Sequence, residues 1–223
     1  MSKPTHAKKK RSSRPTNAAT SDGSRRSVRL ALDCLEVTRG HDGFLRGKPE
    51  PTLLIAAYRA CGAHPLALVG RLLVRARLDC DIPCSVALGE QELHYDASFG
   101  EGERIVVLVL AVEEDSGAGV RALYAALETP DRFLLYDAAS SEPAPRDLAE
   151  WGKARCLAPT AQPVEVLLGE TSLMNLASSD DYVSAAAFSV GTHTHCDEVW
   201  RLPFIAPDAR NDWTLVARLR IGP

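Results

Sequence analysis

The sequence predicts a mainly β protein, an antiparallel β-sandwich with one or two helical insertions. Many short segments alternate between apolar and polar residues or form short apolar runs, which is typical of strands. Only one segment has a clear helical period, and glycine, proline and polar residues separate most of the others. With 223 residues, 45% of them hydrophobic, the chain can form one domain with a substantial core. We expect this domain to span residues 28–223, with its helical insertion around residues 116–151.

Residues 1–27 are expected to form a disordered basic arm. The first 29 residues hold nine lysines and arginines against a single acid, Asp22, whereas the chain as a whole has 26 basic and 29 acidic residues. The arm contains almost no apolar side chains, so it buries too little surface to offset the entropy of ordering it. It could bind nucleic acid or an anionic membrane surface, pair with the acidic remainder of the chain, or be a solubilising tail without a partner.

The first half of the domain has the patterns of strands. Val28–Val37 begins with alternating apolar residues and then slips at Cys34–Leu35, as a β-bulge would allow. The segment Ile105–Val112 (IVVLVLAV) is apolar throughout and predicts a central strand covered on both faces. The other strands expected here are Thr52–Arg59, Leu72–Asp79, Ser85–Leu88 and Glu92–Tyr95.

The pattern then changes to a helical one. Apolar residues recur at helical spacing from Val120 to Leu127, with Asp115 or Ser116 as a cap and Thr129-Pro130 as a stop. A second short helix is expected over Arg146–Trp151, after Pro145. The strands expected in this half are Phe133–Tyr136, Val164–Leu168, Tyr182–Val190 and Val199–Ile205, the last at a sheet edge or bulge because it contains Pro203.

The clearest alternation in the chain lies in Trp213–Ile221. Trp213, Leu215 and Leu219 share one face, which we expect to meet the core, and Arg218 and Arg220 lie on the other. A similar pattern places Arg75 and Arg77 on the polar face of an earlier strand. If the two strands are neighbours, the four residues Arg75, Arg77, Arg218 and Arg220 form a basic stripe that could bind phosphate or carboxylate groups; otherwise they are ordinary solvated side chains.

No catalytic motif is recognisable in the chain. A Gly-x-Ser-x-Gly nucleophile elbow is missing, and the glycine clusters at 100–102 and 117–119 lack the Lys-Ser/Thr of a phosphate-binding loop. The carboxylates of Glu113-Glu114-Asp115 could serve acid–base chemistry, but a solvated turn explains them as well. We therefore expect no enzyme, and a metal-dependent enzyme whose site forms only through tertiary contacts remains an alternative.

The cysteines predict a reduced protein of the cytoplasm. Six cysteines in 223 residues are too sparse for a disulfide framework, and the apolar stretch that an export signal needs after Arg25-Arg26 is interrupted by Asp33. The longest apolar run is too short to cross a membrane, so no transmembrane segment is expected. Zinc could bind Cys80 and Cys84 together with His193-Thr194-His195-Cys196, if the fold brings the two segments together.

Two loops resemble signatures of C-two domains, the calcium- and lipid-binding β-sandwiches first defined in protein kinase C. The segment Gly47-Lys48-Pro49-Glu50-Pro51-Thr52-Leu53 is similar to the family's Gly-x-Ser-Asp-Pro-Tyr-Val signature. The segment Ser179-Asp180-Asp181-Tyr182-Val183-Ser184 resembles the Asp-Asp-Phe-Ile-Gly turn that closes another calcium loop. The resemblance covers residues 28–221 and implies a C-two-like sandwich that acts as a binding or scaffold module.

The resemblance also implies calcium ligands, which would be Asp42, Glu50, Asp180 and Asp181. However, the family's Asp-x-Asp upstream of the third loop has no counterpart, since Leu173-Met174-Asn175 stands there. Calcium takes about six to eight oxygen ligands, several of them usually carboxylates. We therefore expect a metal-free module without a cofactor and without a complete calcium site.

The expected partner is a protein or an anionic surface. The second hypothesis is an accessory protein that docks on nucleic acid through the basic arm.

Overall fold

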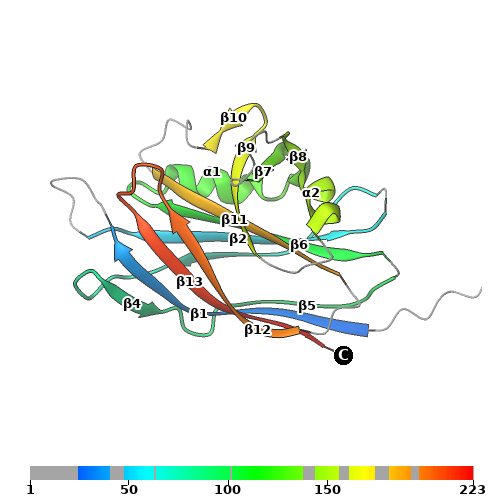
Figure 1. The fold of residues 1–223 in the computed structure, drawn as a ribbon, viewed down its shortest axis with the longest axis horizontal. Coiled ribbons are helices and arrows are strands. Elements are labelled where there is room, and N and C mark those ends of the chain that lie inside the picture. Colours follow the sequence, from blue (N-terminus) through cyan, green and yellow to red (C-terminus); the bar gives the residue numbers. More distant parts are fainter. Residues whose placement is uncertain are drawn as a thin grey trace, which may run out of the picture.

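The computed structural model describes residues 25–40, 48–62, 64–100, 102–137, 144–155, 161–173, 181–191 and 196–222. Two antiparallel sheets and two α-helices are stacked in three layers, with the helices on the outer face of the second sheet (Figure 1). The predicted β-sandwich with helical insertions is confirmed. No helix in the described part is long and apolar enough to cross a membrane. Most of the expected arm, residues 1–24, lies outside the described residues, as do Asp42 and Asp180.

Sheet A contains the first and last strands of the described chain. Its path is β12–β13–β1–β4, and β5 also pairs with β1. The register of β1 shifts between Leu32 and Cys34, which is the bulge predicted from the sequence slip. The bounds are β1 (Arg25–Arg39), β4 (Cys84–Ala87), β5 (Glu92–Ser98), β12 (Cys196–Ile205) and β13 (Asp212–Gly222).

Sheet B follows the path β3–β2–β6–β11–β9–β7–β8, and β10 pairs with β9. Its strands are β2 (Pro51–Ala60), β3 (Ala67–Arg75), β6 (Arg104–Glu113), β7 (Phe133–Asp137), β8 (Arg146–Asp147), β9 (Gln162–Leu168), β10 (Thr171–Ser172) and β11 (Asp181–Gly191).

The main core lies between the two sheets. The predicted face of β13 points into it, and Trp213, Leu215 and Leu219 have no measurable exposure. Opposite them, alternate residues of β2, β6 and β11 fill the space, Phe188 among them. The side chain of Phe188 packs edge-on against Trp200 of β12, with ring centroids 4.4 Å apart. The register predicted for the last strand is therefore confirmed.

A second core lies between sheet B and the helices α1 (Ala118–Ala126) and α2 (Leu148–Arg155). Strand β6 is buried along its whole length because its other face packs on these helices, as the apolar run Ile105–Val112 predicts. Close packing of α2 requires a glycine, since a Cβ atom on Gly152 would lie 2.4 Å from Val106 Cγ2. A short 3-10 helix, η1 (Pro130–Arg132), leads into β7.

Several boundaries differ from those expected. Strand β1 begins at Arg25 rather than Val28, and β3 ends at Arg75, although the alternation of buried and exposed residues continues to Asp79. Helix α2 begins two residues late because Arg146–Asp147 pair with β7 as β8. The cap residue of α1 is Gly117 with φ +68°, not Asp115 or Ser116, while Ser116 Oγ accepts the N–H of Ala118.

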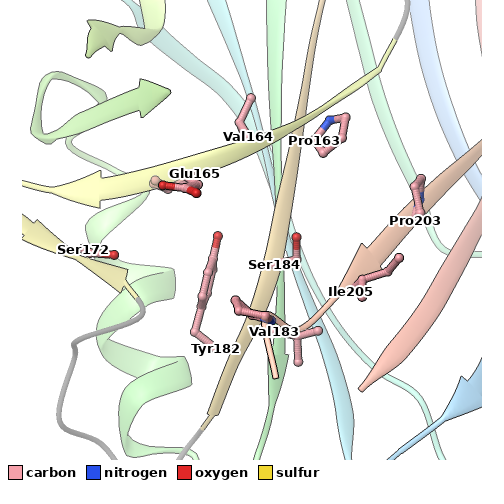
Figure 2. Close-up of a pocket in the computed structure, with 11 residues that line it drawn as sticks. Pro163, Val164, Glu165, Ser172, Tyr182, Val183, Ser184, Pro203 and Ile205 are labelled. Atoms are coloured by element: carbon pink, nitrogen blue, oxygen red, sulfur yellow. The ribbon is translucent and has the colours of Figure 1, made fainter. Parts of the chain in front are cut away.

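Two neighbouring strands of sheet B, β9 and β11, separate along part of their length. Strands β9 and β11 pair only through Gln162–Val164 and Ala185–Ala187, and β11 has a register shift between Tyr182 and Ser184. Between these strands and β12 lies a cavity of about 310 Å³, which we call the edge pocket (Figure 2). Its walls include Val164, Glu165, Tyr182, Val183, Pro203 and Ile205.

Candidate functional site

The two loops that resemble calcium loops lead to the same end of sheet B. Pro51 of β2 and Asp181 of β11 both pair with Glu113, from opposite sides of β6. Glu50 therefore lies two strands away from Asp181, or about 10 Å at the usual strand spacing. We call this part of the molecule the acidic end.

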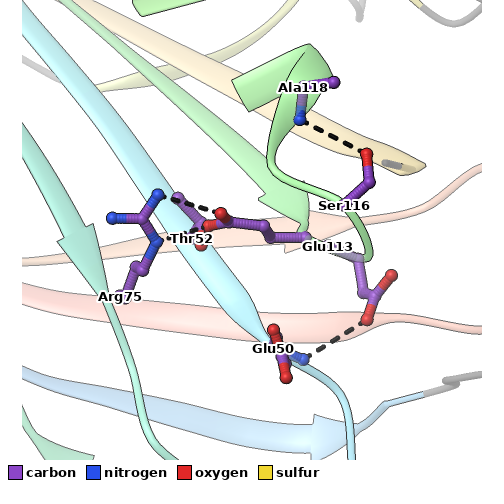
Figure 3. Close-up of polar contacts among 7 residues, drawn as sticks. Glu50, Thr52, Arg75, Glu113, Ser116 and Ala118 are labelled. Carbon is purple, nitrogen blue, oxygen red and sulfur yellow. Dashed lines mark hydrogen bonds and ion pairs between the residues drawn. The ribbon is translucent and has the colours of Figure 1, made fainter. Parts of the chain in front are cut away.

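Two carboxylates of the acidic end, those of Glu113 and Glu114, already have protein partners (Figure 3). Arg75 binds Glu114 with two hydrogen bonds, 2.6 Å from Nε to Oε2 and 2.9 Å from Nη2 to Oε1. The Thr52 hydroxyl donates to Glu114 Oε2 at 2.8 Å, and the Glu50 N–H donates to Glu113 Oε1 at 3.3 Å. Hydrogen bonding to Glu114 raises the pKa of Arg75. These contacts tie β2, β3 and the turn after β6 together, and Arg75 is thus engaged in a structural ion pair.

The described part of the chain holds no group of three or more histidine, cysteine, aspartate or glutamate side chains arranged to bind a metal ion. Cys84 pairs with Val37 at one end of β1, whereas Cys196 pairs through Ile221 with Val28 at the other. Nine residues of strand separate them, or about 30 Å. The two segments of the zinc hypothesis therefore do not meet through Cys196, and His193 and His195 lie outside the described residues.

The thiols of Cys80 and Cys84 lie close to one another at the start of β4. Burial, together with a hydrogen bond to Cys80, raises the pKa of Cys84 to about 11. Since the thiolate is the metal-binding and nucleophilic form, Cys84 is held in its unreactive state at neutral pH.

The four arginines of the expected stripe do not form one surface. Arg75 belongs to sheet B and Arg77 follows it, whereas Arg218 and Arg220 belong to β13 in sheet A. Arg220 instead lies directly opposite Arg29 of β1. The structure thus separates the two pairs and gives Arg220 a different basic neighbour.

Arg29 and Arg220 line a surface cavity of about 580 Å³ on sheet A, which we call the basic cleft. Its lining residues are Arg25, Arg26, Ser27, Arg29, Asp96, Arg220 and Gly222. Four of these seven residues are arginines, and only one is acidic.

Asp96, the one acidic residue of the basic cleft, forms hydrogen bonds with neighbouring side chains. Hydrogen bonds from Ser27 and His94 lower the pKa of Asp96, and the Arg25 charge acts in the same direction. His94 Nε2 lies 2.8 Å from Asp96 Oδ1, while Arg220 Nε lies 3.3 Å from Asp197 Oδ1. Arg26 Nε is buried and has no hydrogen-bond partner within the described ranges. The cleft therefore has an excess of guanidinium groups over carboxylates, which suits an anionic ligand.

Three of these arginines were not predicted from the sequence as binding residues. Arg25 and Arg26 fall within the expected arm, residues 1–27, and Arg29 lies just after it. Their positive charges are therefore expected to belong to a solvated segment rather than to a folded surface. One signal was present in the sequence, because Arg25, Ser27 and Arg29 occupy the positions that alternate with the buried residues Val28 and Leu30. That alternation places Arg25 and Arg29 on one outward face as soon as the strand is extended to Arg25.

Comparisons with known proteins identify no family for this chain. No family model matches, and no curated protein matches. Among solved structures, the chain is similar to the first C-two domain, domain A, of plant extended synaptotagmin 1, with 9% sequence identity and a TM-score of 0.31 over 88% of this chain and 94% of that one. At this distance the similarity carries no information on ligands or site residues.

Proposed function

We propose that this protein is a non-catalytic binding module of C-two-like type that docks on a phosphate-bearing partner through the basic cleft. The main support for this proposal is that Arg29 and Arg220 lie opposite one another on adjacent strands, with Arg25 and Arg26 lining the same cleft. Like charges directly opposite on a sheet are destabilising by themselves. A bound phosphate group that bridges the two guanidinium groups would remove this repulsion and add charge-assisted hydrogen bonds.

The chain leading into the cleft supports the same partner. Strand β1 begins at Arg25, and the 24 residues before it include Lys3, three consecutive lysines at 8–10, Arg11 and Arg14. Positive charge in the sequence thus adjoins positive charge on the folded surface. Polyanions are bound by such combined charge through the release of counterions, which makes the affinity fall with salt.

Sedimentation with phosphatidylserine-containing vesicles and fluorescence anisotropy with duplex DNA, each at low and moderate salt, test the proposal. Arg29→Ala/Arg220→Ala removes two arginines that each contribute about 1 kcal/mol near an anionic surface. We expect affinity for one of the two polyanions to fall by about 30-fold. Preference for vesicles identifies a membrane surface, and preference for DNA supports the nucleic-acid hypothesis.

A matched control removes the same charge elsewhere on sheet A. Arg39→Ala/Arg201→Ala deletes two exposed arginines, whose partners are Asp212 and Glu36. The proposal requires this control to weaken binding much less than the cleft variant. Equal losses in both variants, or binding by neither polyanion, would refute the basic cleft as the docking surface.

A further inference from the structure

The edge pocket is a second candidate binding site, separate from the basic cleft. It opens where β9 leaves β11 after Val164, and where β12 forms the free edge of sheet A. Most of its walls are apolar, formed by Val164, Val183, Pro203 and Ile205. Ile205 is 51% exposed, which is unusual for a large apolar side chain in the described part of this molecule. The volume of about 310 Å³ lies at the lower end of the range of small-molecule sites.

Tyr182 provides a hydrogen-bonding group that the fold does not satisfy. The bulge in β11 sets the position of this residue, and its ring stands in the pocket with the hydroxyl directed toward β9 (Figure 2). The hydroxyl oxygen is buried and has no hydrogen-bond partner among the residues that the structure describes. Burial raises the pKa of Tyr182, and the Glu165 charge raises it further, so the neutral O–H form persists at physiological pH. An unsatisfied buried hydroxyl costs free energy that phenylalanine would not cost at the same position.

Glu165 sets the charge of the pocket. Of the described residues that line it, Glu165 is the only charged one. No hydrogen bond or ion pair to this carboxylate occurs within the described part of the chain. A cationic head group can therefore pair with Glu165 and donate a hydrogen bond to the hydroxyl oxygen of Tyr182, while an apolar body contacts the valine and proline walls. An anionic ligand of the same size is repelled.

We propose that the edge pocket binds a small organic cation, an alkyl- or arylalkylammonium group, through Glu165, Tyr182 and the apolar wall formed with β12. The ligand is recognised by charge at one end and by apolar burial at the other. No residue of the basic cleft or of the acidic end takes part in this site. A result that contradicts one of the two proposals therefore leaves the other unaffected.

Three probes with one apolar body test the proposal. Hexylammonium, hexanol and hexanoate are titrated into the full-length protein, and binding is followed by ¹H–¹⁵N chemical-shift changes. We expect hexylammonium to bind at least tenfold more tightly than hexanoate, with hexanol between them and with shifts centred on β9, β11 and β12. Equal affinity for the cation and the anion, shifts centred elsewhere, or no binding of hexylammonium overturns the proposal.

Two variants separate the charge from the hydroxyl. Glu165→Gln should weaken hexylammonium about tenfold and leave hexanol unchanged, whereas Glu92→Gln, an exposed residue of β5, should change neither affinity. Tyr182→Phe should weaken hexylammonium severalfold while raising the melting temperature of the ligand-free protein. Unchanged hexylammonium affinity in Glu165→Gln contradicts the charge recognition. A Tyr182→Phe variant that melts lower than the natural protein contradicts the unsatisfied hydroxyl.

Discussion

Individual carboxylates in this protein differ in whether the fold has already paired them. Glu114 binds Arg75 and Thr52, and Glu103 binds Arg59 at 2.6 Å and the Gly100 N–H at 2.9 Å. By contrast, the exposed Glu165 lines a pocket together with Tyr182, whose buried hydroxyl has no hydrogen-bond partner in the described part of the chain. A glutamate therefore becomes a candidate binding group here because of what surrounds it, and the residue type alone does not identify it.

The environment of Glu103 should make the free energy of unfolding depend on pH. Burial pushes its pKa upward, but hydrogen bonds from Gly100, Cys61 and Arg59, together with the Arg59 charge, outweigh this effect and leave the pKa below its usual value of 4.5. A carboxyl group whose pKa is lower in the folded state stabilises the fold above its unfolded pKa. The contribution disappears as the pH falls through the lower, folded value.

We expect urea unfolding to show the natural protein more stable than Glu103→Gln near neutral pH. The difference should shrink steadily below about pH 4.5. A matched comparison uses Glu36→Gln, because Glu36 pairs with Arg201 at an exposed position and should contribute less than about 1 kcal/mol. A stability difference for Glu103→Gln that stays constant with pH would contradict the prediction.

Strands and their irregularities determine which side chains meet. The bulge of β1 between Leu32 and Cys34 lets one long strand pair with β5 along its first half and with β4 along its second. Antiparallel pairing of β1 with β13 then places Arg29 opposite Arg220. In sheet B, the register shift in β11 accompanies its separation from β9, which opens the edge pocket. Both candidate sites thus depend on where strands pair and where they stop pairing.

Substitutions on the two faces of strand β13 should differ sharply in how much they lower the free energy of unfolding. Truncating Trp213 or Leu219 to alanine should cost about 2–5 kcal/mol, since both side chains are fully buried in the core between the sheets. On the outer face, Arg218→Ala and Arg220→Ala should each cost less than about 0.5 kcal/mol. Urea unfolding of the four single variants measures both effects. An arginine variant as destabilised as Leu219→Ala would show that this arginine is a structural residue rather than a binding group.

At the scale of the whole molecule, the two charged regions lie at opposite ends of the sandwich. The basic cleft lies where β1 begins, and the acidic end lies beyond its other terminus. There Lys48 Nζ binds the Cys80 carbonyl at 3.1 Å and Cys84 pairs with Val37. Strand β1, with 15 residues, runs the distance between them (Figure 1). In the proposed docking on an anionic surface, this separation favours the orientation in which the cleft faces the surface and the acidic end is turned away.

Calcium provides a test of the acidic end. A working site would stabilise the fold by about 2.7 kcal/mol once free calcium reached a hundredfold excess over its dissociation constant. We expect millimolar calcium to leave the melting temperature unchanged, because Glu114 is held by Arg75 and Thr52 and Glu113 accepts the Glu50 N–H. A calcium-dependent rise that disappears in Asp181→Asn would contradict this and restore the calcium interpretation of the two loops.

Local patterns in the sequence determined the strands, the central buried segment and the helical insertion. Alternation with a period of two shows which face of β13 is apolar, and the continuous apolar run of β6 indicates burial on both faces, because these patterns depend only on neighbouring residues. The resemblance of two loops names Glu50 and Asp181 as calcium ligands, which stays a prediction, and only the structure shows that both loops lead to the same end of sheet B.

Tertiary structure alone decided which charged residues meet. Arg29 and Arg220 are almost 200 positions apart, and only the pairing of β1 with β13 brings them together. Arg75 belongs to the same residue type and the same kind of polar strand face, yet the fold joins it to Glu114. Strand pairing and register follow from long-range packing of the buried faces, and the outward charges are carried along with them. The sequence pattern therefore predicts that such residues point outward, and the packing of the core selects their neighbours.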